Sequence, residues 1–464
     1  MKKKLICLFL VLAMATSIFA TVATASQRHD NLLLLEEAAV DAGITVVELL
    51  AVEAEVDAIY GENFSANQRE AILQIESINA GFSRSRDGSV IYPDFYAGSG
   101  LYNDGSLLLL IVESELENAY RHDVIGSLLE NGARYVLVDY SHADLLEVLG
   151  AVNDVVYEQR AVLRSNCIYS LNVSAISIDP RMNRVVVGIV EYNYSMISGF
   201  RRHLYDSPML VFEQMGVIEL GGDHSTYNFC YDSISGIFDN DDWGHSYYHN
   251  AETEISPANL TWANPGERVS RPPLLGNYGT IGFRVHCQDK RLTGFLTTGS
   301  VFNNGDNLIL GSVGITTIGT VYSRRFFYNV PNGINAAFVT YTGSLRVTNT
   351  FPNGRNINLS VTNPQFGMPL YAFGSRTGHM VNGAVNRTNF YFYNGHRRFN
   401  NMTQVTGIGG SARSQSGDSG GAVITAQGNS VGLIAGGDQS QFIVVPLSRI
   451  LDDFRRTGYS LQRR

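Results

Sequence analysis

The sequence has very little lysine. Only four of its 34 basic residues are lysine, namely Lys2, Lys3, Lys4 and Lys290, and the others are arginine. The formal charge of −9 argues against a nucleic-acid-binding surface, which needs clustered basic residues. After residue 25, no stretch reaches the roughly 20 apolar residues that span a bilayer, so we expect no transmembrane segment in the mature chain.

Cysteine is also scarce. Cys7 lies in the amino-terminal apolar run, and the remaining three, Cys167, Cys230 and Cys287, allow at most one internal disulfide. No CxxC pair is present, which removes the usual zinc and redox sites, and we predict no metal or cofactor. The acidic run Asp239–Asp242 lacks the glycine and terminal glutamate of an EF-hand, which favours a solvated turn over a calcium site.

The length of 464 residues, with 44% hydrophobic residues, predicts several folded domains. Residues 1–25 have the pattern of an export signal: Lys2–Lys4, an apolar run, and Ala23-Thr24-Ala25 before Ser26. An uncleaved membrane anchor is the alternative. The small residues at the cleavage position favour removal of the segment, so we expect a secreted, extracellular protein.

Residues 26–217 predict an α+β domain. The apolar spacing over 31–80 is helical, and Asn103-Asp104-Gly105 marks a hairpin turn. A helix ended by Gly132 and a strand, RYVLVDY, follow, and Ser141 with Asp144 forms a capping box that opens another helix. The segment SAISIDPRMNRVVVGIV predicts a second hairpin around Asp179-Pro180.

Turn-forming residues dominate from 218 to 262, which indicates a linker. From 263 to 464, short runs of β-branched and aromatic residues alternate with glycine, asparagine and serine. This spacing predicts an all-β sandwich or barrel. The final segment PLSRILDDFRR predicts a closing helix.

The strongest local motif is Gly417-Asp418-Ser419-Gly420-Gly421. Glycines beside a serine let the backbone approach a substrate carbonyl closely, and the N–H groups of Gly417 and Ser419 can form an oxyanion hole. We expect Asp418 to turn inward and to pair with a buried cation or amine. The alternative is a polar turn between two strands.

With GFLTTGSV and INAAFV upstream, GDSGGAV resembles the chymotrypsin-like (trypsin-like) serine peptidases, in the bacterial branch of alpha-lytic protease and the streptogrisins. TIGFRV and GSRTGHMVNGAV also resemble that branch, and the likeness covers roughly residues 260–458. More weakly, YPDFYAG and NRVVVGIV resemble the pro-regions of such enzymes. The resemblance implies a double six-stranded β-barrel, endopeptidase ancestry, secretion, and a pro-segment that assists folding and blocks the cleft.

The resemblance also implies that the catalytic triad is incomplete. Its serine nucleophile matches Ser419, but the position of its histidine holds Ser300 and that of its aspartate holds Asn335. Loss of the histidine alone costs about a millionfold in turnover in well-studied serine peptidases. The branch's cysteine after the histidine is Val301 here, so Cys287 loses its usual partner.

No obvious residue replaces the missing base. In the expected hairpin His286 pairs with Thr293, which places the imidazole about 23 Å along the strand from the position opposite Ser300. Lys290 lies in the turn of that hairpin, farther away. The sequence does not place His379 and His396, for which surface or core positions are favoured.

The resemblance places Arg413 near the base of the primary specificity pocket, where it would favour acidic side chains or a carboxylate terminus; a solvated loop arginine is the equal alternative. Ala435-Gly436-Gly437 matches the strand that pairs with substrate backbone, so Ala435 and Gly437 are expected to line the pocket and to bind peptides by strand addition.

Three hypotheses follow. We favour a monomeric, secreted pseudoenzyme that binds a peptide or a protein partner. An active serine endopeptidase with a relocated general base is the second, and a non-catalytic surface scaffold is the third. Whether the chain is an enzyme stays open at this stage.

Overall fold

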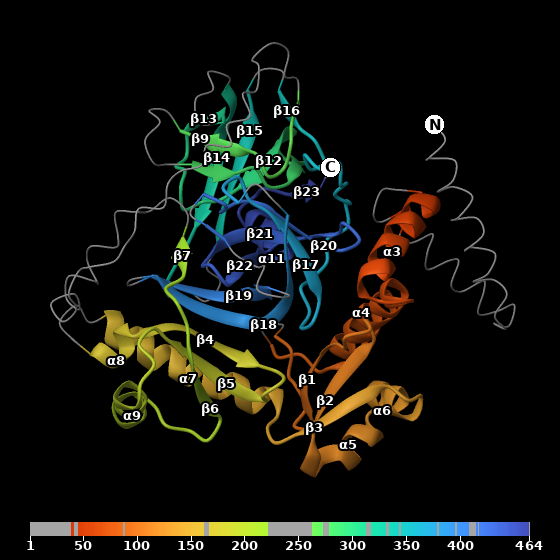
Figure 1. The fold of residues 1–464 in the computed structure, drawn as a ribbon, viewed down its shortest axis with the longest axis vertical. Helices are drawn as coiled ribbons and strands as arrows, with labels where there is room; N and C mark the ends of the chain where they lie inside the picture. The colour runs from red at the N-terminus through yellow and green to blue at the C-terminus, as the bar shows by residue number, and fades with distance from the viewer. Residues whose placement is uncertain are drawn as a thin grey trace, which may run out of the picture.

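The computed structural model describes residues 39–40, 45–86, 89–161, 167–220, 262–271, 278–311, 317–330, 334–342, 345–377, 380–394, 397–407, 414–415 and 417–463. The chain forms an amino-terminal α+β module and two β-barrels, and the module packs against the second barrel (Figure 1). The predicted export signal, Cys230 and the acidic run Asp239–Asp242 lie outside the described residues.

The first part of the amino-terminal module is a three-stranded sheet with helices around it. Its elements are α3 (Val46–Tyr60), α4 (Phe64–Gly81), β1 (Tyr96–Leu101), β2 (Leu107–Val112), η1 (Glu113–Glu115), α5 (Leu116–Arg121), α6 (Asp123–Glu130) and β3 (Arg134–Val138). The predicted Asn-Asp-Gly hairpin is confirmed, because β1 and β2 pair antiparallel on either side of it and Gly105 has a φ of +82°. Strand β3 runs parallel to β2.

The second part consists of α7 (His142–Ala161), α8 (Ile168–Leu171), β4 (Val173–Asp179), β5 (Arg184–Ile189), α9 (Tyr194–His203) and β6 (Leu210–Gln214). The predicted capping box is present: Ser141 N donates to Asp144 Oδ2 at 3.2 Å, and Asp144 N donates to Ser141 Oγ at 3.1 Å. The second predicted hairpin is also confirmed by the antiparallel pairing of β4 and β5.

The first barrel is built from β9 (Arg268–Ser270), β10 (Tyr278–Thr280), β11 (Arg284–Cys287), β12 (Leu292–Thr297), β13 (Asn307–Leu310), β14 (Thr317–Phe326) and β15 (Asn335–Tyr341). Strands β10 and β11 are consecutive parts of one stretch of chain, and they pair with opposite ends of the sheet, β9 and β12. The sheet therefore closes on itself. A short parallel pair, β8 (Trp262–Ala263) and β16 (Arg346–Val347), lies beside it.

The second barrel contains β17 (Pro369–Phe373), β18 (Met380–Asn394), β19 (Arg397–Gly407), β20 (Ala422–Thr425), β21 (Ser430–Gly437) and β22 (Gln441–Pro446). It closes because β17 pairs with both β20 and β18. The predicted final helix is α11 (Leu447–Arg456). The sequence did not predict β23 (Leu461–Arg463), which pairs with β11 of the first barrel. The predicted α+β module and double barrel are confirmed.

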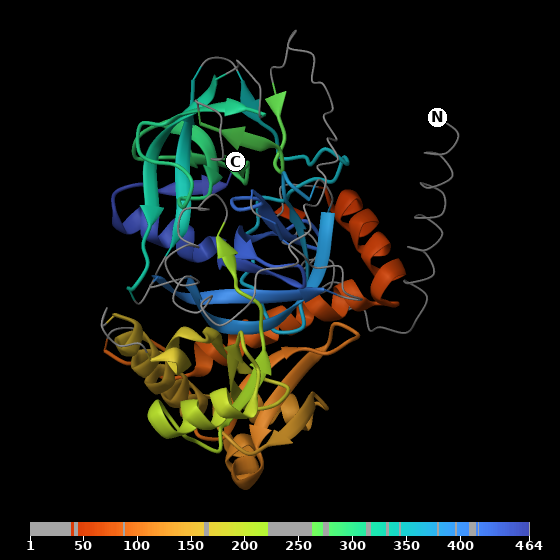
Figure 2. The same ribbon diagram turned by 60° about the vertical axis from the view of Figure 1, so that its left-hand side comes forward.

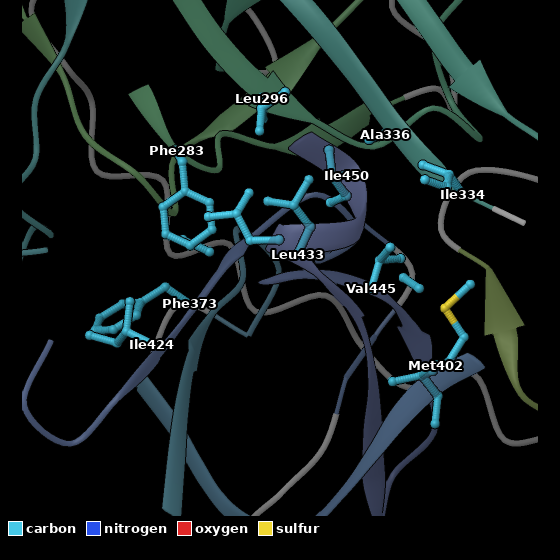
Figure 3. Close-up of a cluster of buried hydrophobic side chains, with 14 of the residues drawn as sticks. Phe283, Leu296, Ile334, Ala336, Phe373, Met402, Ile424, Leu433, Val445 and Ile450 are labelled. Atoms are coloured by element: carbon cyan, nitrogen blue, oxygen red, sulfur yellow. The ribbon is translucent and has the colours of Figure 1, made fainter. Parts of the chain in front are cut away.

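The two barrels share one hydrophobic core. Figure 3 shows Phe283 and Leu296 of the first barrel close to Phe373 and Leu433 of the second, with Ile450 of α11 among them. All five side chains are buried. Burying apolar area stabilises by roughly 25 cal/mol per Å², so this shared core holds the barrels together. The loops between the barrels are therefore fixed relative to one another.

The amino-terminal module is joined to the second barrel by strand pairing. Strand β4 pairs antiparallel with β18, with Ile176 opposite Tyr391, so the module extends the barrel sheet (Figure 2). Helix α3 also contacts the second barrel, through a 3.0 Å hydrogen bond between the hydroxyl groups of Tyr60 and Tyr371. The module is thus part of a continuous structure with the barrels.

Candidate functional site

The loop of residues 417–421, called the serine loop below, lies between the two barrels and forms hydrogen bonds with both. The hydroxyl of Ser419 donates to the carbonyl of Ala435 on β21 at 3.0 Å. The carbonyl of Ser419 accepts the N–H of Thr280 on β10 at 3.0 Å. Only 1% of Ser419 is exposed. The hydroxyl of Ser419 is therefore directed toward a carbonyl oxygen. A carbonyl oxygen is not a general base and does not remove the proton of the hydroxyl.

Gly417 has a backbone shape that only glycine fits. Its φ is +107°, and a Cβ built there would lie 2.1 Å from the ring of Tyr278. Its carbonyl accepts hydrogen bonds from Thr280 Oγ1 at 2.8 Å and Ser375 Oγ at 3.1 Å. These contacts fix the start of the loop. The oxyanion hole of Gly417 and Ser419 stays a prediction.

Asp418 turns inward, as expected, but backbone N–H groups rather than a cation contact its carboxylate. Its Oδ1 accepts the N–H groups of Arg376 at 2.7 Å and Thr377 at 3.0 Å, and its Oδ2 accepts that of Gln415 at 2.9 Å. Burial raises the pKa of this carboxyl group, while these backbone hydrogen bonds oppose the rise. Among the described residues, Asp418 makes no ion pair.

Ser300 and Asn335, the two positions singled out by the sequence, lie together. Asn335 Oδ1 accepts the backbone N–H groups of Gly299 and Ser300, each at 2.8 Å, and the hydroxyl of Thr298 at 2.9 Å. The amide nitrogen of Asn335 faces the hydroxyl of Ser300 at 3.4 Å. The segment also contacts the serine loop, because a Cβ on Gly420 would lie 2.6 Å from Thr298 N.

The groups in this cluster are hydroxyls and an amide, which are poor proton acceptors at neutral pH. Of the histidines in the described residues, His122, His142 and His203 belong to the amino-terminal module. His286 on β11 pairs with Thr293, as the sequence predicted, and its Nδ1 lies 3.1 Å from that hydroxyl. His379 and His396 are outside the described residues.

A short strand of the same chain lies on the predicted peptide-binding strand. Strand β7 (Glu219–Leu220) pairs antiparallel with β21, with Leu220 opposite Gly436 and Glu219 opposite Gly437. Figure 1 shows β7 reaching up from the amino-terminal module to β21. Ala435, the residue before this pairing, accepts the hydroxyl of Ser419. The strand therefore lies beside the serine loop, while Arg413 is outside the described residues.

The sequence reasoning missed β7, which falls at the start of the predicted linker. The available signal was the alternation of Ile218 and Leu220, both buried, immediately before two glycines. The reasoning also missed the contacts of Tyr278 and Thr280 with the serine loop, for which no local signal exists. In the described part of the chain, Cys167 and Cys287 are free.

No cluster of three or more metal-ligating side chains is found among the described residues. Within the same residues, no helix is both long and apolar enough to cross a membrane.

Comparison with known proteins gives matches to both parts of the chain. Residues 145–215 match the family model of the Pro-like C-terminal domain. No curated protein sequence matches the chain. The structure of chymotrypsin from Cellulomonas bogoriensis is similar over 44% of this chain and 98% of its own, with 20% identity and a TM-score of 0.34.

Protease A from Thermobifida fusca is similar over 44% of this chain and 100% of its own, with 22% identity and a TM-score of 0.34. A glutamic acid specific serine protease has the same coverage and identity, with a TM-score of 0.35. The chain thus joins a segment similar to the Pro-like C-terminal domain to a double-barrel fold.

Proposed function

We propose that this protein is a secreted, proteolytically degenerate serine peptidase homologue that binds peptide or protein segments along β21. The observation that carries the proposal is the antiparallel pairing of β7 with Gly436 and Gly437. A strand edge that accepts one extended segment offers backbone hydrogen bonds to any other segment of suitable shape. The chain's own β7 then acts as a competing, tethered ligand.

The chemistry around Ser419 supports weak or absent peptide hydrolysis. A serine attacks an amide only when a neighbouring base accepts its proton. Ser300 and Asn335 offer no such base, and the hydroxyl of Ser419 donates to a carbonyl. A millionfold loss corresponds to about 8 kcal/mol of barrier, while an oxyanion hole alone retains roughly a thousandfold over water.

Two variants of one residue test peptide binding. Leu220→Pro removes the backbone N–H of β7 and disturbs its pairing, whereas Leu220→Ala removes the side chain and keeps that N–H. We expect a library of extended peptides to bind Leu220→Pro at least tenfold more tightly than wild type. Leu220→Ala should lie between the two. Equal binding to all three proteins, with folding intact, would contradict peptide binding at this strand.

Labelling with a fluorophosphonate probe separates the pseudoenzyme from an active endopeptidase. The proposal expects no labelling of Ser419 in wild type or in Leu220→Pro. Stoichiometric labelling that disappears in Ser419→Ala, together with digestion of casein, would establish a relocated base instead. Because binding and labelling are measured separately, loss of one part of the proposal leaves the other testable.

A further inference from the structure

A pocket rich in arginine lies on the first barrel, separate from the serine loop. Its volume is about 390 Å³, and Arg284 on β11, Arg291 in the following turn and Arg346 on β16 contribute to its wall. Thr293 and Tyr341 complete much of the lining. Three guanidinium groups around one cavity are unexpected in a chain whose formal charge is −9.

Among the described residues, the two least exposed arginines, Arg387 and Arg398, are matched by carboxylates. Arg387, for example, forms ion pairs with both Asp179 and Glu213. Among the described residues, neither Arg284 nor Arg291 has an ion-pair partner. The buried Nε of Arg284 also has no hydrogen-bond partner. Within the described part of the chain, no carboxylate therefore neutralises Arg284 or Arg291.

A fourth arginine, Arg463, contacts one of the lining residues. Arg463 on β23 donates to the carbonyl of Arg284, to Ser430 Oγ at 3.0 Å and to Asn349 Oδ1 at 3.4 Å, all of them neutral acceptors. Burial, and then the positive charge of Arg284, lower the pKa of Arg463 to about 9. The site thus carries an electrostatic cost that a bound anion would offset.

Aromatic rings contact two of these guanidinium groups and orient them. Arg346 lies over the ring of Tyr341, 4.9 Å from its centroid, and Arg463 lies over the ring of Phe283 at 4.6 Å. Planar guanidinium groups fixed in this way are suited to the oxygen pairs of phosphate and sulfate. Holding the donors before a ligand arrives lowers the entropic cost of binding.

We propose that this pocket binds a doubly charged tetrahedral oxyanion, a phosphate or sulfate group. Because three arginines line the pocket, their combined positive charge favours a dianion over a single carboxylate. The cavity is larger than one such ion, so the group can belong to a larger molecule. The lining residues include none from the serine loop or β21, so the pocket is separate from the proposed peptide-binding strand.

The test uses calorimetric titration of the full chain with inorganic phosphate and sulfate at constant ionic strength, with acetate and chloride as comparison anions. We expect saturable binding of one phosphate or sulfate, at least tenfold tighter than acetate. Phenyl phosphate distinguishes a free ion from an ester: tighter binding of phenyl phosphate identifies the group as part of a larger ligand, and equal or weaker binding identifies the free ion.

Two variants locate the site. Arg291 has a φ of +53°, which asparagine tolerates, so Arg291→Asn removes the charge with little strain. We expect Arg291→Asn and Arg346→Gln each to weaken phosphate binding at least tenfold. Arg456→Gln, at an exposed position of α11, should leave it unchanged. Absence of saturable binding, or equal binding in all four proteins, would overturn the proposal.

Discussion

The side-chain oxygen of Asn335 accepts the backbone N–H of Ser300 at 2.8 Å. The neighbouring N–H of Gly299 uses the same oxygen, so one amide group fixes the loop next to the serine loop. An asparagine can perform this structural task as well as an aspartate, because either offers an acceptor oxygen. It cannot supply the negative charge that stabilises an imidazolium ion.

The first prediction follows from this arrangement. The double substitution Ser300→His and Asn335→Asp should restore a base and a carboxylate beside the serine loop, and fluorophosphonate labelling of Ser419 should appear. Ser300→His alone should react roughly ten-thousandfold more slowly, since an amide in place of the carboxylate has about that effect in a serine protease. Addition of Ser419→Ala is the control, and a folded double variant that stays unlabelled would contradict the prediction.

The second prediction concerns the stability of the same loop. Asn335 is fully buried, and Asn335→Leu leaves the N–H groups of Gly299 and Ser300 without their acceptor. An unsatisfied buried group costs about 1–3 kcal/mol, so we expect a loss of about 2–4 kcal/mol in the free energy of unfolding. Asn335→Asp keeps the acceptor and should lose less. Chemical denaturation measures the free energy of unfolding of both variants. If both were as stable as the wild type, the loop would not depend on this side chain.

The third prediction concerns the attachment of the amino-terminal module. Arg387 on β18 is 2% exposed, and its Nη2 lies 3.3 Å from Asp179 Oδ2 of β4 and 2.7 Å from Glu213 Oε2 of β6. Arg387→Met leaves the buried carboxylate of Asp179 without its ion-pair partner. Such a loss typically lowers the free energy of unfolding by about 3–5 kcal/mol. Hydrogen exchange should then show faster opening of β4.

Arg184→Met is a matched control for that change. Arg184 pairs with Asp139, whose side chain is 65% exposed, and such surface pairs contribute about 0–1 kcal/mol. Exchange in β4 should therefore remain close to wild type. If both variants behaved alike, the buried ion pair would not be what attaches the module.

Much of the fold could be predicted from the sequence because its signals are local. The turn at Asn103-Asp104-Gly105 and the capping box of Ser141 each lie within a few residues, and both are present. The pairings β4–β18 and β7–β21 could not be predicted, because each joins segments far apart in the chain. The apolar residues of these strands indicate a strand, but they do not indicate which other strand it pairs with.

In the candidate site, too, some features could be predicted from the sequence and others could not. The resemblance identified Ser300 and Asn335 as equivalent to catalytic positions, and the structure brings these two side chains together. For Asp418, the expected partner was a cation, whereas in the structure backbone N–H groups donate to its carboxylate. Backbone donors can come from any residue type, so the sequence contained no sign of them.

The fourth prediction is a loss of stability in acid that comes from His142. Its ring lies 4.6 Å from that of Tyr92, and burial lowers its pKa to about 4 from the ordinary value of 6.5. Between those pH values the unfolded chain binds more protons at this residue than the folded chain does. Its contribution to stability is therefore complete above about pH 6.5 and is lost as the pH falls toward 4.

The expected loss from His142 is on the order of 2 kcal/mol, discounted because the side chain is half-buried and water reaches part of it. Thermal unfolding between pH 7 and pH 4 measures the effect on the wild type and on His142→Gln, which cannot gain the proton. The variant should show a shallower fall in melting temperature over this range. His203→Gln is the control, since His203 stacks on Tyr169 in a separate helix pair, and an identical pH dependence in all three proteins would contradict the assignment to His142.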